Sequence, residues 1–195
     1  MKSAANWDAE FKAGKYAFLR RPAERARLVA IAAMIEHSTR ARRPVEIADL
    51  GCGEGLLLDF LDPSRVWRYV AVDISREALR AVPDGEISVR RVRARLHEWD
   101  GRPAPVARRI LVASEVLYYD PIGVAHLEKL GERHGGASEA IVSCLAGKAG
   151  KPHWTHSSDR LWRGMHGTGW RQIETARVRD ASADLTWDIA RYAIA

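Results

Sequence analysis

The chain has 195 residues, of which 47% are apolar and 29% are charged, as in one ordinary globular domain. Its formal net charge of +6 makes nucleic acid or an acidic small molecule a partner to consider, but no apolar run approaches the roughly 20 residues that a membrane span needs. The two cysteines are too few for a disulfide framework, and residues 1–12 lack the apolar stretch of a secretory signal, so we expect a soluble, cytoplasmic protein without a metal site.

The order of the predicted elements indicates an α/β protein. Residues 8–36 have apolar positions at helical spacing and predict two helices ahead of the first strand. The predicted strands are 45–50, 69–73, 86–92, 109–114 and 139–145, and the predicted helices between and after them are 56–61, 77–82, 122–133 and 158–166. Two further strands, 170–178 and 185–195, are joined by a polar turn and predict an antiparallel hairpin.

This alternation predicts one Rossmann-like domain over residues 1–195. Its sheet is expected to be seven-stranded and mostly parallel, with helices on both faces and a C-terminal antiparallel hairpin. Residues 44–195 form the expected core. Residues 1–43 hold the N-terminal helices, in which Trp7 and Tyr16 are candidates either for a lid over a site or for anchors in the core.

A glycine-rich turn follows the first predicted strand. Glycines at this position let the backbone turn tightly and approach a ligand closely. A dinucleotide fingerprint requires its third glycine three positions after the second, but Leu56 stands there, so the spacing argues against a pyrophosphate. The turn suits an S-adenosyl ligand, which has no phosphate. Its residues form the run Asp49, Leu50, Gly51, Cys52, Gly53, Glu54 and Gly55.

An acidic residue, Asp73, ends the second predicted strand. Its two carboxylate oxygens can accept hydrogen bonds from both hydroxyls of a ribose. The competing interpretation is that Asp73 caps the next helix, although Ser75 is equally suited to that position. The co-occurrence of the glycine turn and this acid favours the ribose.

Three successive segments resemble the motifs of class I methyltransferases: residues 48–55, residues 72–75 and Ser114-Glu115-Val116-Leu117-Tyr118-Tyr119. The resemblance covers about residues 45–195. It implies that S-adenosylmethionine is the cofactor, that the glycine turn with Asp49 and Cys52 holds its methionine portion, and that Asp73 holds its ribose. It also implies that Ser114 and Glu115 lie beside the reactive methyl group.

The adenine end departs from the family pattern. Arg95 stands where the family often has an acid that receives the adenine amino group. The backbone around Arg95 and Leu96 is therefore the expected adenine contact, with Glu98 as the alternative. The resemblance also implies that Ile74 packs on the adenine, and core packing competes with that role.

Candidates for the acceptor side lie after the fourth and fifth strands. Tyr118 is the first catalytic candidate, and a loop with His153, Trp154, His156 and Asp159 provides the second, His156. A surface loop is the alternative interpretation of that segment. The two histidines lack a set of further ligands, so no zinc is expected there.

The Glu115–Tyr119 run and the Trp/His segment further resemble nodulation-type N-methyltransferases, which implies a small polar acceptor, sugar-like or an amine, stacked on Trp154 or Trp162. Methyl transfer from a sulfonium relies mainly on proximity and orientation. The expected function is therefore N- or O-methylation of a small molecule. An RNA methyltransferase, supported by the arginines at positions 90, 91, 93 and 95, and a non-catalytic binding protein remain the alternatives.

Overall fold

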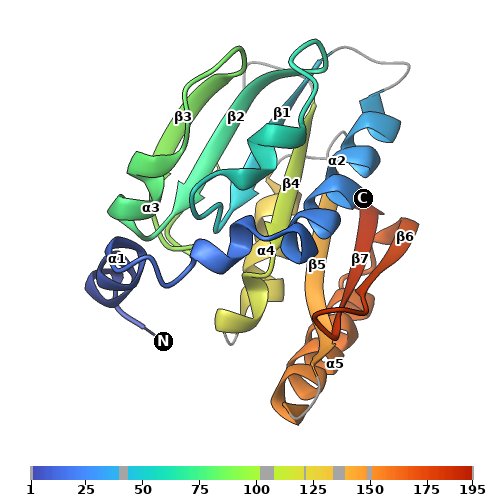
Figure 1. The fold of residues 1–195 in the computed structure, drawn as a ribbon. Coiled ribbons are helices and arrows are strands. Elements are labelled where there is room, and N and C mark those ends of the chain that lie inside the picture. Colours follow the sequence, from blue (N-terminus) through green and yellow to red (C-terminus); the bar gives the residue numbers. More distant parts are fainter. Residues whose placement is uncertain are drawn as a thin grey trace.

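The computed structural model describes residues 2–39, 44–101, 108–120, 122–133, 139–148 and 151–194. One sheet of seven strands forms its centre, in the order β3-β2-β1-β4-β5-β7-β6 (Figure 1). The strands are β1 (Val45–Leu50), β2 (Val66–Asp73), β3 (Ser88–Arg93), β4 (Arg109–Ser114), β5 (Glu139–Lys148), β6 (Arg171–Asp180) and β7 (Leu185–Ala193).

Strand direction confirms the predicted topology. Pairing is parallel from β3 through β5, and β7 runs antiparallel to both β5 and β6. The mostly parallel sheet with a C-terminal antiparallel hairpin is thus confirmed. Residue 195, the predicted end of the last strand, lies outside the described residues.

The helices follow the predicted order, with differences in their bounds and in the short helices. They are α1 (Ala4–Lys12), η1 (Ala17–Arg20), α2 (Pro22–Thr39), η2 (Leu56–Phe60), α3 (Arg76–Ala81), η3 (Leu117–Tyr119), α4 (Gly123–Glu132) and α5 (Pro152–Gly167), where η marks a 3-10 helix. The helix predicted over 56–61 is present as the 3-10 helix η2, whereas the short helices η1 and η3 were not predicted. The predicted loop around His153 and His156 is also wrong, because α5 begins at Pro152, and a proline is well tolerated in the first turn of a helix.

Apolar side chains on both faces of the sheet explain the layers. Strand β1 is buried along its whole length, as expected for a central parallel strand. Its Val45 and Ile47 pack with α2, η2 and α3 on one face, and its Ala48 and Leu50 pack with α4 and α5 on the other. Helices therefore cover both faces, as predicted. No helix in the described part of the chain is long and apolar enough to cross a membrane.

The register of the strands brings three loop starts together. Leu50 lies beside Val72 of β2, and Asp49 lies beside Val112 of β4. The turns after β1, β2 and β4 therefore begin next to one another at the carboxyl edge of the sheet, where open α/β sheets bind ligands. Helix α1 lies against α3 near these turns (Figure 1).

Candidate functional site

A cavity of about 470 Å³ opens at this carboxyl edge. Its walls come from the glycine turn, the ends of β2 and β4, the turn after β3, and the N-terminal segment. Of the predicted site residues, those that line it are Tyr16, Asp49, Gly51, Cys52, Gly53, Asp73, Ile74, Arg95, Leu96, Ser114, Glu115 and Tyr118. The fold thus brings most of the predicted site into one cavity of the size usual for small ligands.

The glycine turn has the backbone conformation that its residues predict. Gly51, Gly53 and Gly55 all have positive φ angles, of 70°, 56° and 73°. A Cβ added to Gly51 would lie 2.4 Å from Cγ2 of Val116, so this position has no room for a side chain. Gly55 does not line the cavity, and its added Cβ would instead lie 2.9 Å from Val82. Gly55 therefore acts in the packing of the turn.

Asp73 is placed by backbone hydrogen bonds at both ends of its carboxylate. Oδ2 accepts from the amide of Gly53 at 2.9 Å, and Oδ1 accepts from the amide of Ser75 at 2.8 Å. Ser75, not Asp73, caps α3 by accepting from the amide of Ala78. Burial raises the pKa of Asp73 despite these hydrogen bonds. Each oxygen keeps a further lone pair, so the carboxylate can still accept from a ligand that enters the cavity.

A second buried carboxylate, Asp49, lies at the end of β1. It accepts a hydrogen bond from the hydroxyl of Tyr69, and burial raises its pKa to about 6. Burial also raises the pKa of the neighbouring Cys52, so its sulfur stays a thiol at neutral pH. A cavity with ionisable acids that lack full compensation favours a ligand that carries positive charge.

Arg27 is a cavity residue that the sequence analysis missed. It lies on α2 with only 5% of its surface exposed, and it donates to Ser114 and, at 3.4 Å, to Glu24. Its positive charge lowers the pKa values of Asp49 and Glu115, against the larger effect of burial. No local motif marks Arg27, since a helical arginine is usually exposed and only the packing of α2 on the sheet brings it into the cavity.

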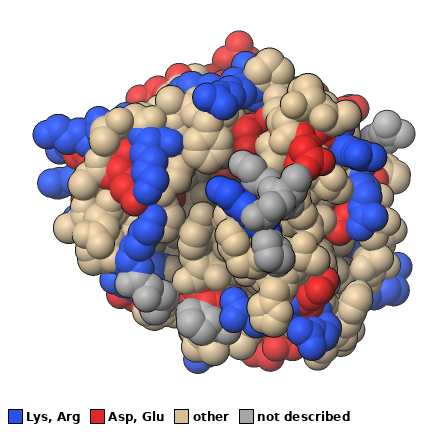
Figure 2. Space-filling model, turned by 60° about the horizontal axis from the view of Figure 1, so that its bottom comes forward, with Lys and Arg blue, Asp and Glu red and all other residues tan. Residues whose placement is uncertain are grey.

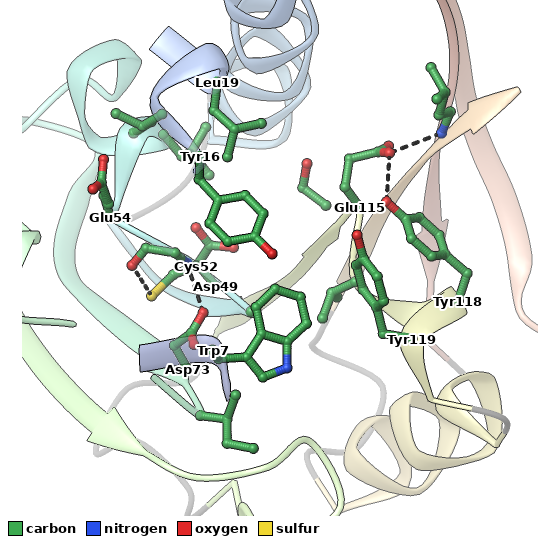
Figure 3. A pocket seen from close by; sticks show the side chains of 18 of the residues that line it. Trp7, Tyr16, Leu19, Asp49, Cys52, Glu54, Asp73, Glu115, Tyr118 and Tyr119 are labelled. Atoms are coloured by element: carbon green, nitrogen blue, oxygen red, sulfur yellow. Dashed lines mark hydrogen bonds between the residues drawn. The ribbon is translucent and has the colours of Figure 1, made fainter. Parts of the chain in front are cut away.

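Glu115 connects the ends of β4 and β5. Its carboxylate accepts from the amide of Leu145 at 3.1 Å, from the hydroxyl of Tyr118 at 3.1 Å and from the hydroxyl of Ser143 at 3.3 Å. The residue has a φ of 59°, a conformation that is uncommon outside glycine. These three donors hold the carboxylate in place, and Figure 3 shows it facing Tyr118.

The phenol of Tyr118 keeps its proton at neutral pH. Burial, followed by the nearby charge of Glu115, raises its pKa well above the usual value. Tyr118 also lies against Tyr119, with ring centroids 4.6 Å apart, and edge-on to Trp154 at 5.3 Å. Trp154 lines the cavity as well. This wall can orient a polar or flat molecule, but it does not offer a phenolate base.

Aromatic side chains of the N-terminal segment cover the cavity. The ring of Trp7 stacks on Tyr16 at 5.6 Å and meets Tyr119 edge-on at 5.3 Å. Figure 3 shows Trp7 and Tyr16 in the space between Asp73 and Tyr119. Asp8 attaches α1 beside them, because its carboxylate accepts from Ser75 Oγ at 2.7 Å. The N-terminal segment therefore contributes directly to the cavity wall.

The turn after β3 forms the remaining wall. Arg95 and Leu96 line the cavity, whereas Glu98 does not. The carboxylate of Glu98 accepts instead from the amide of Arg95 at 3.1 Å, and the two side chains lie 3.6 Å apart as an ion pair. Glu98 thus shapes the turn from outside.

Two predicted acceptor residues lie elsewhere. His156 is exposed on α5 and is not among the residues that line the cavity. Trp162 packs against the core cluster of the face that α4 and α5 cover, and its Nε1 is buried there. Both positions follow from α5 being one continuous helix, whose side chains point to different sides.

The arginines at positions 91, 93 and 95 have acidic neighbours. Arg91 contacts Asp84 at 2.8 Å, Arg93 contacts Asp8 at 3.4 Å, and Arg95 pairs with Glu98. On the face drawn in Figure 2, basic and acidic side chains are interspersed. This arrangement favours a solvated strand with its exit turn over a stripe that binds nucleic acid.

Comparison with known proteins identifies the fold. No protein-family model and no curated protein matches the sequence. Among solved structures, the chain is similar to 1,6-didemethyltoxoflavin-N1-methyltransferase of Burkholderia thailandensis, with a TM-score of 0.70 and 15% identity over 98% of this chain and 86% of that one. That structure contains S-adenosylhomocysteine.

Two other solved structures agree. The N-methyltransferase NodS of Bradyrhizobium japonicum WM9 gives a TM-score of 0.64 at 16% identity, over 92% of this chain and 91% of that one. The magnesium protoporphyrin IX methyltransferase of Synechocystis PCC 6803 gives 0.66 at 12% identity, over 100% and 98%. These structures contain S-adenosylhomocysteine and S-adenosylmethionine, respectively. The chain described here therefore has the class I methyltransferase fold.

Proposed function

We propose that the protein transfers the methyl group of S-adenosylmethionine to a nitrogen or oxygen of a small polar molecule. One observation carries this proposal: a single cavity runs from the glycine turn and Asp73 to the wall of Tyr118, Tyr119 and Trp154. A cofactor held at the first end would present its methyl group toward an acceptor at the second. The fold that the chain shares with methyltransferases supports the same conclusion.

The residues present fit the cofactor. Gly51 lets the turn pack directly on Val116 while its backbone lines the cavity, and the free oxygen lone pairs of Asp73 suit the two ribose hydroxyls. Asp49, whose pKa is raised by burial, would pair with the ammonium group of the methionine portion. The guanidinium of Arg27 would hold the carboxylate of that portion, since it is buried and lines the same cavity.

The adenine end would rest on Ile74 and on the backbone of Arg95 and Leu96, all of which line the cavity. Trp7 and Tyr16 would close over the bound cofactor as a lid, together with the rest of the 1–43 segment. Within one 1–195 domain, this segment would complete a site that the 44–195 core begins.

The chemistry needs little from the protein beyond position. When bound, the cofactor supplies an electrophilic methyl carbon, to which the acceptor forms a bond as the carbon–sulfur bond breaks and its electron pair stays on sulfur. The wall of Tyr118, Tyr119 and Trp154 would hold the acceptor in line with that carbon. Because Tyr118 keeps its proton and donates it to Glu115, its oxygen would orient the acceptor by accepting a hydrogen bond from it. The acceptor's proton would pass to water.

The acceptor class follows from the same wall. Aromatic rings beside a few polar groups suit an amine or a sugar-like molecule. The solved neighbour from Burkholderia thailandensis also binds a small molecule, 1,6-didemethyltoxoflavin. Both cysteines are free, which suits the reducing cytoplasm as the place of action. His156 has no place in this proposal, because it lies outside the cavity lining.

Calorimetry with S-adenosylhomocysteine tests the cofactor half. The full chain should bind one equivalent, and Asp73→Asn should bind at least about tenfold more weakly, because it weakens hydrogen bonds to a charged group. Asp84→Asn is the matched control, since Asp84 is exposed and pairs with Arg91 outside the cavity. Absence of binding by the intact chain, or equal binding by Asp73→Asn, would contradict the proposal.

Transfer of a labelled methyl group tests the acceptor half. The full chain and labelled S-adenosylmethionine are incubated with a bacterial extract separated into small metabolites and RNA. Label in the metabolite fraction is expected, and it should be reduced with Asp73→Asn. Label confined to RNA would overturn the small-molecule acceptor, and cofactor binding without any transfer would overturn the assignment as an enzyme.

A further inference from the structure

Three side chains with metal-binding groups meet at the rim of the cavity. His97 lies in the turn after β3, Asp120 follows η3, and His126 lies on α4. One ligand atom from each residue lies within 4.8 Å of the other two. Nδ1 of His126 is 2.8 Å from Oδ2 of Asp120, and Nδ1 of His97 is 3.9 Å from the same oxygen. One carboxylate oxygen thus faces two imidazole nitrogens.

We infer that His97, Asp120 and His126 form a site for a divalent transition metal ion of the zinc type. Two imidazoles and a carboxylate are a ligand set that such ions accept. Ligand atoms about 2.1 Å from a tetrahedral ion are about 3.4 Å apart, which lies between the two distances measured here. Small side-chain rotations would therefore admit the ion in place of the His126–Asp120 hydrogen bond.

A backbone hydrogen bond orients the carboxylate of Asp120 toward the two imidazoles. The other oxygen of Asp120, Oδ1, accepts from the amide of Ile122 at 3.1 Å, which leaves Oδ2 directed toward the imidazoles. The other nitrogen of His97, Nε2, lies 4.0 Å from a carboxylate oxygen of Glu98. This separation is longer than a hydrogen bond, so Glu98 lies near the imidazole without fixing its orientation.

Two of the three side chains in this cluster are largely buried. The side chains of Asp120 and His126 are 11% and 19% exposed, and that of His97 is 35% exposed. The ring centroids of His97 and His126 lie 5.1 Å apart. The hydrogen bond between His126 and Asp120 does not require this second imidazole. The cluster therefore contains more than a structural hydrogen bond requires.

The position of the site indicates what it does. His97 and Asp120 line the cavity, and three protein ligands leave a coordination position for water or a polar ligand group. The ion would join the turn after β3 to η3 and α4, and so fix the cavity rim next to Arg95 and Leu96. Methyl transfer itself needs no metal, so this site goes beyond the proposed function.

Cobalt binding tests the inference directly. The full chain, expressed without a polyhistidine tag and treated with a chelator, is titrated with Co²⁺ while its visible absorption is followed, and then with Zn²⁺ in competition. One equivalent of Co²⁺ should give the absorption of a four- or five-coordinate ion, and Zn²⁺ should abolish it. With Zn²⁺ at about 100 times its Kd, the Tm should rise by roughly 5–10 °C.

Variants locate the ion. His97→Ala and Asp120→Asn should each weaken binding by more than the roughly 10–100-fold that loss of an outer partner costs. Since His97 is partly exposed, its variant is expected to stay folded, and circular dichroism checks this. The matched control, His166→Ala, changes an exposed histidine near the end of α5 and should bind as the parent does.

Two results would overturn the site: no cobalt absorption in the parent chain, or absorption that His97→Ala and Asp120→Asn retain. The chelated chain should still bind S-adenosylhomocysteine, because the proposed cofactor contacts do not include the ion. A failure of the metal site is thereby distinguishable from a failure of the proposed function.

Discussion

Replacing the buried acid Asp49 by asparagine should stabilise the free protein and weaken cofactor binding. The pKa of Asp49 in the folded chain is about 6, whereas an aspartate in an unfolded chain has a pKa of about 3.9. The folded state therefore binds the proton more tightly. The free energy of unfolding therefore falls as the pH rises from about 4 to about 6. Above that range, ionisation of the buried Asp49 lowers the free energy of unfolding by its full amount, about 3 kcal/mol.

The stability arm of this prediction uses thermal and urea unfolding of the full chain at neutral pH. The amide introduced by Asp49→Asn would keep an oxygen that can accept from Tyr69 but would carry no charge. Asp49→Asn should therefore be up to about 3 kcal/mol more stable than the parent, with a Tm up to roughly 6–12 °C higher. Asp84→Asn, an exposed change of the same chemistry, should leave the Tm within about 2 °C.

The binding arm follows from the same carboxylate. A cationic ammonium group nearby lowers the pKa of a carboxyl group by about 1–3, so the pKa of Asp49 should fall to about 4 in the complex. Only about a tenth of the free protein has an ionised Asp49 at pH 5, so S-adenosylhomocysteine should bind about tenfold more weakly at pH 5 than at pH 7. Calorimetry at both pH values measures this ratio.

Asp49→Asn should remove most of that pH dependence and should bind about 100-fold more weakly than the parent at pH 7. A variant that keeps the parent's pH dependence would show that another cavity acid, such as Asp73, is responsible. A Tm below that of the parent would refute the argument that burial of the charge destabilises the free protein.

Two further changes test the turn and the lid. Gly51→Ala should lower the free energy of unfolding by about 3 kcal/mol, because backbone strain at a φ of 70° adds to a contact of 2.4 Å with Val116. Gly14→Ala is the control: its φ is 68° but its Cβ would meet open space, so it should lower the free energy of unfolding by only about 1 kcal/mol. Equal losses in urea unfolding would contradict the role of the contact. Trp7→Ala should weaken S-adenosylhomocysteine binding by about 5–30-fold, because the ring that would cover the bound cofactor beside Tyr16 and Tyr119 is lost, and Trp7→Phe should restore most of the affinity. Unchanged calorimetric affinity in Trp7→Ala would remove this residue from the lid.

Local sequence determined the sheet and the cofactor end of the cavity. Strands β1 and β4 begin and end at the predicted residues, because a short, mostly apolar run bounded by turn-forming and polar residues has few other stable structures. The glycine turn and Asp73 were also predictable, since the turn follows β1, Asp73 ends β2, and the carboxyl ends of parallel strands meet. Helix α5 was longer than predicted, because its polar first turn resembles a loop.

Tertiary structure alone decided which distant side chains share the cavity. Arg27 enters it from α2, Trp7 covers it from α1, and His156 is directed away by the rotation of α5. The cluster of His97, Asp120 and His126 has no signature in the sequence, because the second and third residues lie 23 and 29 positions after the first and all three come from separate elements. Hydrophobic periodicity and motif spacing in the sequence describe residues that are neighbours along one helix or strand. These contacts depend instead on how separate elements pack together.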